Sequence, residues 1–171
     1  FGEAVSRGNL RKVRQRVGFV FQNPDDQLFC PTLFEDVAFG PRNLGLPEDE
    51  VWRRVEAGLR SVGLEGLGGK SAYHLSVGQK KRASLATVLA MNAEVLVLDE
   101  PTAGLDPRGR REILELLRGF GGTQVIATHD LGFVEDLCDR AVVLSAGRVV
   151  RDGAPGEILG DGPFLERFGL A

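Results

Sequence analysis

Residues 95–101 read VLVLDEP, and they decide the fold. Four apolar residues in a row, without polar alternation, predict a strand buried within a sheet. The strand ends at Asp99 and Glu100. An aspartate delivered in this way suits a site that holds Mg²⁺ through water beside nucleotide phosphates, and the glutamate next to it is placed to deprotonate an attacking water. The structural alternative is a strand that ends in a solvated acidic turn.

Three further stretches predict strands because they are short, apolar and rich in β-branched residues. They are residues 17–21, which end at Gln22; residues 124–128, which end at His129; and residues 141–144, which lead through a turn into a second run, 149–150, as an antiparallel hairpin at the sheet edge.

Helical patterns lie between the predicted strands. They cover residues 47–62, 77–91, 107–120 and 130–138, the last with Asp130 as a candidate N-cap. Strands that alternate with helices predict an α/β fold, in which a mainly parallel sheet is flanked by helices. Ligands of such sheets bind beyond the carboxyl ends of the strands. We therefore expect the polar residues at the three strand ends to form one site.

The stretch LSVGQKKR, residues 75–82, has the pattern of a helix start. Ser76 and Gln79 satisfy the S-x-x-Q capping box, and Gly78 permits close approach to the backbone. The exposed amides of such a helix N-terminus bind anions. An ordinary capped helix is the alternative, and the basic residues 80–82 are then a solvated basic face.

Two further residues are expected near the carboxylates. Asp106, in AGLDP at 103–107, follows Glu100 so closely in sequence that it must lie near the same site. A lone histidine is more often structural than catalytic, but His129 stands at a strand end beside two carboxylates, which favours a functional role.

Residues 64–71, LEGLGGKS, imitate the phosphate-binding pattern G-x-x-x-x-G-K-[ST], with Leu64 in place of the first glycine. The stretch follows a predicted helix rather than a buried strand. We therefore expect a loop between two helices, with Lys70 at the surface and without a phosphate role.

The bulk composition excludes several classes of protein. The net charge of −3 over 171 residues argues against nucleic acid as a partner. No apolar run reaches the roughly 20 residues that span a bilayer, so we expect neither a transmembrane segment nor a signal peptide. Cys30 and Cys138 lack metal-ligand spacing, so we expect reduced thiols.

In chain order, the strand ending at Gln22 and the motifs LSVGQ, VLVLDEP, AGLDP and ATHD resemble the nucleotide-binding domain of ABC ATPases, over nearly the whole chain. The resemblance implies a P-loop NTPase-like ABC ATPase domain with an inserted helical subdomain, ATP and Mg²⁺ as cofactors, and ATP hydrolysis. Val77 stands where the commoner motif LSGGQ has glycine, and we interpret it as a subfamily character.

The resemblance also implies catalytic roles. Gln22 is matched to the Q-loop glutamine, which senses Mg²⁺ and the attacking water. Asp99 is matched to the Walker B aspartate that holds Mg²⁺, and Glu100 to the catalytic base. His129 is matched to the switch histidine that contacts the γ-phosphate.

A second set of matched residues implies a dimer. Ser76, Gly78 and Gln79 belong to the signature motif, which in this family binds the γ-phosphate held by another protomer. Asp106 is matched to the D-loop residue at the dimer seam. The expected partner is therefore a second ABC ATPase protomer, identical or paralogous.

Residues 22–46 and the tail 153–159, GAPGEIL, resemble the ATPases of energy-coupling-factor importers, particularly the cobalt and nickel type. In that group the segment after the Q-loop forms part of the groove that grips a coupling helix of the transmembrane subunit. Phe29, Phe34 and Phe39 would line that groove or form core of the helical subdomain, and we expect some of each. The resemblance places the protein peripherally at the cytoplasmic face of the cell membrane.

We expect residues 1–22 to end the N-terminal core part, 23–92 to form the helical subdomain, and 93–171 to form the RecA-like core and C-terminal segment. The family's Walker A loop normally precedes the Q-loop, and the 171 residues contain none. We therefore expect an N-terminally truncated piece that binds and hydrolyses ATP poorly alone. The alternatives are a non-transport ABC ATPase of DNA repair or translation, whose typical heptads and basic blocks are absent from this sequence, and a non-catalytic docking module.

Overall fold

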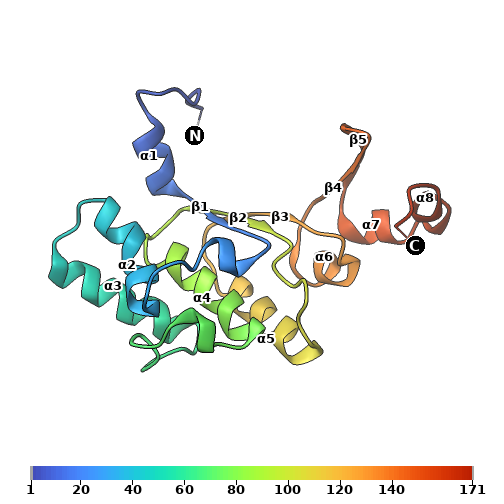
Figure 1. The fold of residues 1–171 in the computed structure, drawn as a ribbon. Coiled ribbons are helices and arrows are strands. Elements are labelled where there is room, and N and C mark those ends of the chain that lie inside the picture. The colour runs from blue at the N-terminus through green and yellow to red at the C-terminus, as the bar shows by residue number, and fades with distance from the viewer. Residues whose placement is uncertain (1, 171) are drawn as a thin grey trace. The chain divides into compact units, whose positions relative to one another are not determined.

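A computed structural model describes residues 2–170 (Figure 1). The chain forms two compact units, of which one ends at Ala127 and the other begins at Thr128. The division expected from the sequence, with a helical subdomain over 23–92, stays a prediction.

The first unit contains three strands, five α-helices and two short 3-10 helices within the described residues. In chain order they are α1 (Leu10–Arg16), β1 (Val17–Val20), η1 (Pro24–Asp26), α2 (Leu33–Asn43), α3 (Glu48–Ser61), η2 (Ala72–His74), α4 (Val77–Leu89), β2 (Val95–Asp99), α5 (Pro107–Arg118) and β3 (Thr123–Ala127). The predicted strands and helices of this part are confirmed within a few residues, whereas α1 and α2 were not predicted as helices.

The three strands form a parallel sheet in the order β1-β2-β3, which confirms the predicted sheet type. Helices α4 and α5 lie on one side of it (Figure 1). Gly18 of β1 allows the close approach of α4, because a methyl group added there would lie 2.9 Å from Val88 Cβ. Gln124 of β3 ties the sheet to α5 by donating from Nε2 to the Leu117 carbonyl over 2.8 Å.

Strands β1 and β2 carry their fully buried residues on one face, and β3 has no fully buried residue, which corrects the expectation of strands buried within the sheet. Val20, Leu96 and Leu98 point toward the helices and are at most 1% exposed. Phe19 and Val125 are level with each other across the sheet and stand 44% and 54% exposed on the other face. The apolar run in the sequence could not distinguish a two-sided from a one-sided burial, because both faces carry apolar residues.

Strand β1 ends at Val20, one residue before the predicted end. The reason lies in Gln27, whose Oε1 accepts a hydrogen bond from the Phe21 N–H over 3.1 Å. Gln27 also donates from Nε2 to the Ser84 carbonyl over 3.0 Å and to Thr87 Oγ1 over 2.7 Å. One side chain therefore stops the strand and binds the segment after it to α4.

Helices α2, α3 and α4 pack around a core of their own. Helix α2 begins with a capping box, in which Thr32 Oγ1 accepts from the Glu35 N–H and Glu35 Oε2 accepts from the Thr32 N–H. Helix α3 begins after Pro47 with three acidic residues, which suit the positive end of the helix dipole. The core of this part consists of residues that are at most 1% exposed: Leu33, Val37, Ala38, Val51, Val55 and Leu59.

Residues 64–71 form a loop between α3 and η2, as predicted, and Lys70 is exposed. The Lys70 carbonyl accepts from the Leu33 N–H and the Gly68 carbonyl accepts from the Phe34 N–H, both over 2.8 Å. Carbonyls, not amides, therefore face the adjacent helix start, so the loop completes the cap of α2.

The second unit contains α6 (Leu131–Leu137), β4 (Ala141–Ser145), β5 (Arg148–Gly153), α7 (Pro155–Leu159) and α8 (Gly162–Arg167). The predicted hairpin is confirmed, but it forms a two-stranded sheet of its own, so its placement at the edge of the main sheet was wrong. The turn residues Ala146 and Gly147 both have positive φ, as a two-residue hairpin turn requires. Asp130 caps α6 as predicted, because its Oδ1 accepts from the Phe133 N–H over 2.9 Å.

Within residues 2–170, no helix is both long enough and apolar enough to cross a bilayer.

Candidate functional site

The carboxyl end of β2 carries the two predicted catalytic carboxylates. Asp99 is the last residue of the strand, and the Glu100 N–H continues the ladder by donating to the Ala127 carbonyl over 2.8 Å. Glu100 has φ of +45°, a conformation that costs a residue with a side chain about 1–3 kcal/mol. Such strain persists where the surrounding structure enforces it, and it is concentrated at functional sites.

The predicted capping box at the start of α4 is present. Ser76 Oγ accepts from the Gln79 N–H over 3.3 Å, and Gln79 Oε1 accepts from the Ser76 N–H over 2.9 Å. The next residue, Val77, is exposed. A methyl group added at Gly78 would meet only Leu105 Cδ2, at 3.9 Å, which is ordinary contact. The surrounding residues therefore leave room for a side chain at this position. The close approach that Gly78 permits would serve a group that is not part of this chain.

The start of α4 and the AGLDP turn line one groove of about 610 Å³. It brings Ser76, Gly78 and Gln79 together with Asp106. Asp106 is the N-cap of α5, and its Oδ1 accepts from the Gly109 N–H over 2.7 Å. The structure therefore joins the four residues that the sequence assigned to ligand binding across a dimer.

The basic residues that follow the capping box are not a solvated face, which corrects that alternative. Lys81 is 3% exposed, and its ammonium donates to the carbonyls of Gln22 over 2.7 Å and Glu100 over 2.9 Å. Burial lowers the pKa of Lys81, while the charges of Glu100 and Asp99 act in the opposite direction. Lys80 is half-buried and pairs with Asp25 over 2.6 Å.

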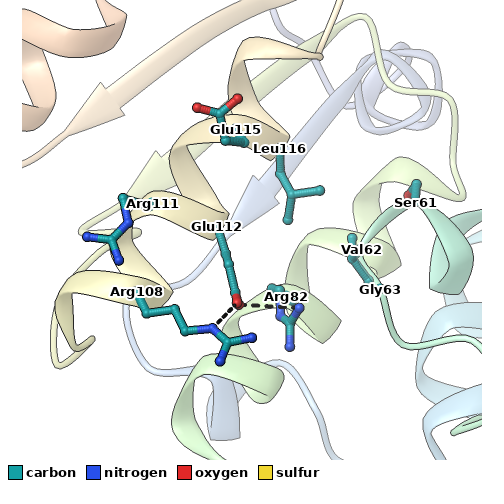
Figure 2. A pocket seen from close by; sticks show the side chains of 9 residues that line it. All are labelled: Ser61, Val62, Gly63, Arg82, Arg108, Arg111, Glu112, Glu115 and Leu116. Carbon is teal, nitrogen blue, oxygen red and sulfur yellow. Dashed lines mark hydrogen bonds and ion pairs between the residues drawn. The ribbon is translucent and has the colours of Figure 1, made fainter.

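Arg82 links α4 to α5 through Glu112, as Figure 2 shows. Glu112 Oε2 lies 3.4 Å from Arg82 Nη1, and its Oε1 accepts from Arg108 Nε over 2.9 Å. These side chains line a second pocket of about 530 Å³ (Figure 2), and they also line the groove. The Arg82–Glu112 ion pair therefore links α4 to α5, and the Arg108–Glu112 pair lies within α5.

Gln22 is exposed, two residues beyond the end of β1. Its backbone carbonyl contacts the Lys81 ammonium, and Lys81 in turn contacts the Glu100 carbonyl. The structure thus places the backbones of Gln22 and Glu100 on either side of one nitrogen. His129 is exposed and belongs to the second unit, so the meeting of His129 with the carboxylates stays a prediction.

The residues at the end of β2 and at the start of α4 fit Mg²⁺ and a phosphate, respectively. Among residues 2–170, no group of three or more His, Cys, Asp or Glu side chains lies close enough to hold a metal ion. Mg²⁺ beside nucleotide phosphates takes one or two carboxylates and completes its shell with phosphate oxygens and water, so Asp99 alone is a sufficient protein ligand. The capped start of α4, with Gly78 open to the groove, fits an anion.

Comparison with known proteins identifies the family. Residues 1–103 match the family model described as ABC transporter. The chain belongs to the ABC transporter family. This confirms the resemblance to ABC ATPases that was predicted from the sequence motifs.

Two curated relatives are energy-coupling factor transporter ATP-binding proteins named EcfA. That of Methanocaldococcus jannaschii is 52% identical over 165 residues, which are 95% of this chain and 59% of the relative. That of Carboxydothermus hydrogenoformans is 50% identical over 173 residues, covering 99% of this chain and 64% of the relative. The ABC transporter chain described here therefore spans less than two thirds of the length of these proteins.

Two solved structures share the fold. The structure of cbiO1 from Clostridium perfringens, described as part of the ABC transporter complex cbiONQ, has a TM-score of 0.82 at 45% identity, over 96% of this chain and 67% of that one. A dimeric ATP-binding cassette in a post-hydrolysis state, bound to ADP and Pi, has a TM-score of 0.76 at 28% identity, over 88% and 68%. The predicted α/β fold of an ABC ATPase domain is confirmed.

Sequence reasoning missed Lys81 and Gln27, which help to bind the segment after β1 to α4. A signal for Lys81 was available, because it precedes the buried residues Leu85 and Val88 by four and seven positions and so lies on the buried face of the helix. For Gln27 the sequence gives no signal of the contact with α4, since its partners on that helix are 57 and 60 residues away in sequence.

Proposed function

We propose that this ABC transporter chain is part of an ATP-hydrolysing energy-coupling subunit of an importer. The observation that carries the proposal is the arrangement at the end of β2, where Glu100 is held in a strained conformation directly after Asp99. The groove between the start of α4 and the AGLDP turn supports it as a second ligand site.

In this proposal Asp99 would hold Mg²⁺ and Glu100 would accept the proton of the attacking water. The ion, when bound, would neutralise charge on the phosphates. Gln22, which follows β1, would help to hold the ion and to orient the water, and His129 would contact the γ-phosphate. The 171 residues by themselves are expected to bind ATP poorly, as the sequence predicted.

The groove between α4 and the AGLDP turn is assigned to a nucleotide held by a second protomer. Ser76 and Gly78 offer an oxygen-binding helix start, and Gly78 carries no side chain that would block it. Asp106 is engaged as the cap of α5, which fixes the turn that lines the other side of the groove. Two protomers, identical or paralogous, would therefore enclose two ATP molecules between them.

The segment after β1 is assigned to a transmembrane subunit. Phe29 and Phe39 stand 63% and 50% exposed with ring centroids 5.2 Å apart, although they are large and apolar. Phe34 is half-buried against Trp52, with ring centroids 4.2 Å apart. An exposed aromatic pair on a capped, well-packed helix suits an apolar helix of a partner. The protein would then lie peripherally at the cytoplasmic face of a membrane, and cobalt ions, nickel ions or a vitamin are the proposed cargo.

The test is steady-state ATP hydrolysis by the full-length protein and its Glu100→Gln variant. The variant keeps the shape of the side chain and removes the base, so hydrolysis is expected to fall by about 10²–10⁴-fold while binding of a fluorescent ATP analogue is retained. Glu56→Gln, on the exposed side of α3, is the matched control and is expected to hydrolyse ATP at the unchanged rate. Equal rates of ATP hydrolysis by Glu100→Gln and Glu56→Gln would refute the role of Glu100 as the catalytic base.

A further inference from the structure

Lys81 occupies an unusual position for a lysine. It lies inside α4, 3% exposed, and its ammonium donates hydrogen bonds to two backbone carbonyls. One carbonyl belongs to Gln22 and the other to Glu100, which are 59 and 19 residues away in sequence. Both belong to the segments that follow the parallel strands β1 and β2.

The two carbonyls lie beyond the point where β1 and β2 are paired. Pairing of β1 with β2 ends at Val20 and Leu98, after which the Phe21 N–H donates to Gln27. The Lys81 ammonium donates to both carbonyls, and the Glu100 carbonyl also accepts from the Ala103 N–H over 3.2 Å. Since one nitrogen contacts both oxygens, it also sets the separation of the two segments.

A neutral donor would satisfy the carbonyls at a lower desolvation cost than a buried ammonium. Burial lowers the pKa of Lys81, and the charges of Glu100 and Asp99 act in the opposite direction. One of the two bridged carbonyls belongs to Glu100, the proposed catalytic base, and this position distinguishes Lys81 from an ordinary core residue.

Lys81 also connects these segments to the start of α4. It follows the capping residue Gln79 by two positions on the same rigid helix. A second tie runs parallel to it, because Gln27 bonds the Ser84 carbonyl and Thr87 Oγ1 of the same helix. The backbone at Gln22 and Glu100 is thereby tied to the helix whose start lines the groove.

We infer that Lys81 is a positioning residue for ATP hydrolysis: it holds Gln22 and Glu100 at a fixed separation and couples both to the helix start that contacts the nucleotide of the second protomer. The inference rests on the proposed function. In this way a nucleotide of the second protomer, bound in the groove, would align Glu100 with the nucleotide of its own protomer.

The test compares Lys81→Met with Lys80→Met in the full-length protein. Methionine matches the length of the lysine stem but donates no hydrogen bond. Lys80 is the neighbouring lysine on the same helix and bonds the Asp25 side chain instead of the two carbonyls, so it is the matched control. We expect Lys81→Met to lower kcat by about ten- to a hundredfold with a nearly unchanged Kd for a fluorescent ATP analogue, and Lys80→Met to change neither. If Lys81→Met does not fold, Lys81→Gln, whose amide reaches one carbonyl, replaces it.

Single-turnover hydrolysis in a Glu100→Gln background provides the decisive readout. If Lys81 acts through Glu100, adding Lys81→Met to Glu100→Gln causes no further loss of rate, because both changes disable the same catalytic group. A full additional loss in the double variant, or a kcat of Lys81→Met equal to that of Lys80→Met, overturns the inference while the proposed function stands. Failure of the unchanged protein to hydrolyse ATP overturns both.

Discussion

Substituting Gly78 by alanine separates what this residue does for the fold from what it does for the site. Gly78 is the second residue of α4, and the added methyl group would meet only Leu105 Cδ2 at 3.9 Å. Alanine is favoured over glycine in a helix by about 0.5–1 kcal/mol. Because no atom has to move, we expect this gain to appear in the free energy of unfolding, as a rise of about 1–4 °C in Tm.

The same methyl group would be added to the lining of the groove, at the helix start proposed to bind the phosphate. We therefore expect ATP hydrolysis by the full-length Gly78→Ala protein to fall, on the order of a hundredfold if one transition-state donor is lost. Gly78→Ala should thus raise Tm and lower the rate of ATP hydrolysis.

Gly156→Ala is the matched control for this experiment. Gly156 is also the second residue of its helix, α7, and an added methyl group would meet nothing within 4 Å. It should give a similar rise in Tm with unchanged hydrolysis. A lower Tm for Gly78→Ala would refute the packing argument, and a normal hydrolysis rate would refute the assignment of the groove to a nucleotide.

The remaining predictions concern the segment after β1. Replacing both Phe29 and Phe39 by serine should leave Tm nearly unchanged, because both rings are exposed, yet abolish co-purification with the transmembrane subunit; retained co-purification would exclude this docking surface. Asp36 is 3% exposed and accepts from the Phe29 and Cys30 amides over 2.9 and 2.8 Å, so Asp36→Ala should lower the free energy of unfolding by about 2 kcal/mol. Burial raises the pKa of Asp36, so its contribution to stability is largest below about pH 4 and is lost as the pH rises through the folded-state value; urea unfolding should show this trend in the unchanged protein but not in Asp36→Asn. Burial, with Asp36 nearby, raises the pKa of the Cys30 thiol to about 11, so alkylation by iodoacetamide at pH 8 should be on the order of a hundredfold slower than for free cysteine, with Cys30→Ser to assign the signal.

The sequence by itself determined those features that depend on neighbouring residues. The parallel sheet and helix α5 follow from local runs and periodicity, and the capping box of Ser76 and Gln79 follows from a spacing of three residues. A cap is satisfied within one turn of helix, so no distant residue is needed to predict it. The order of the motifs was likewise enough to identify the family, which the match over residues 1–103 confirms.

Only the tertiary structure decided the features that depend on residues far apart in sequence. The burial of Lys81, the end of β1 at Val20 and the exposure of Phe19 each depend on segments brought together by folding. The positive φ of Glu100 and the separate sheet of β4 and β5 also lie outside local propensity. The physical reason is that burial and hydrogen-bond satisfaction are properties of an environment. A lysine, an amide or a phenyl ring takes its role from whichever groups the fold places against it.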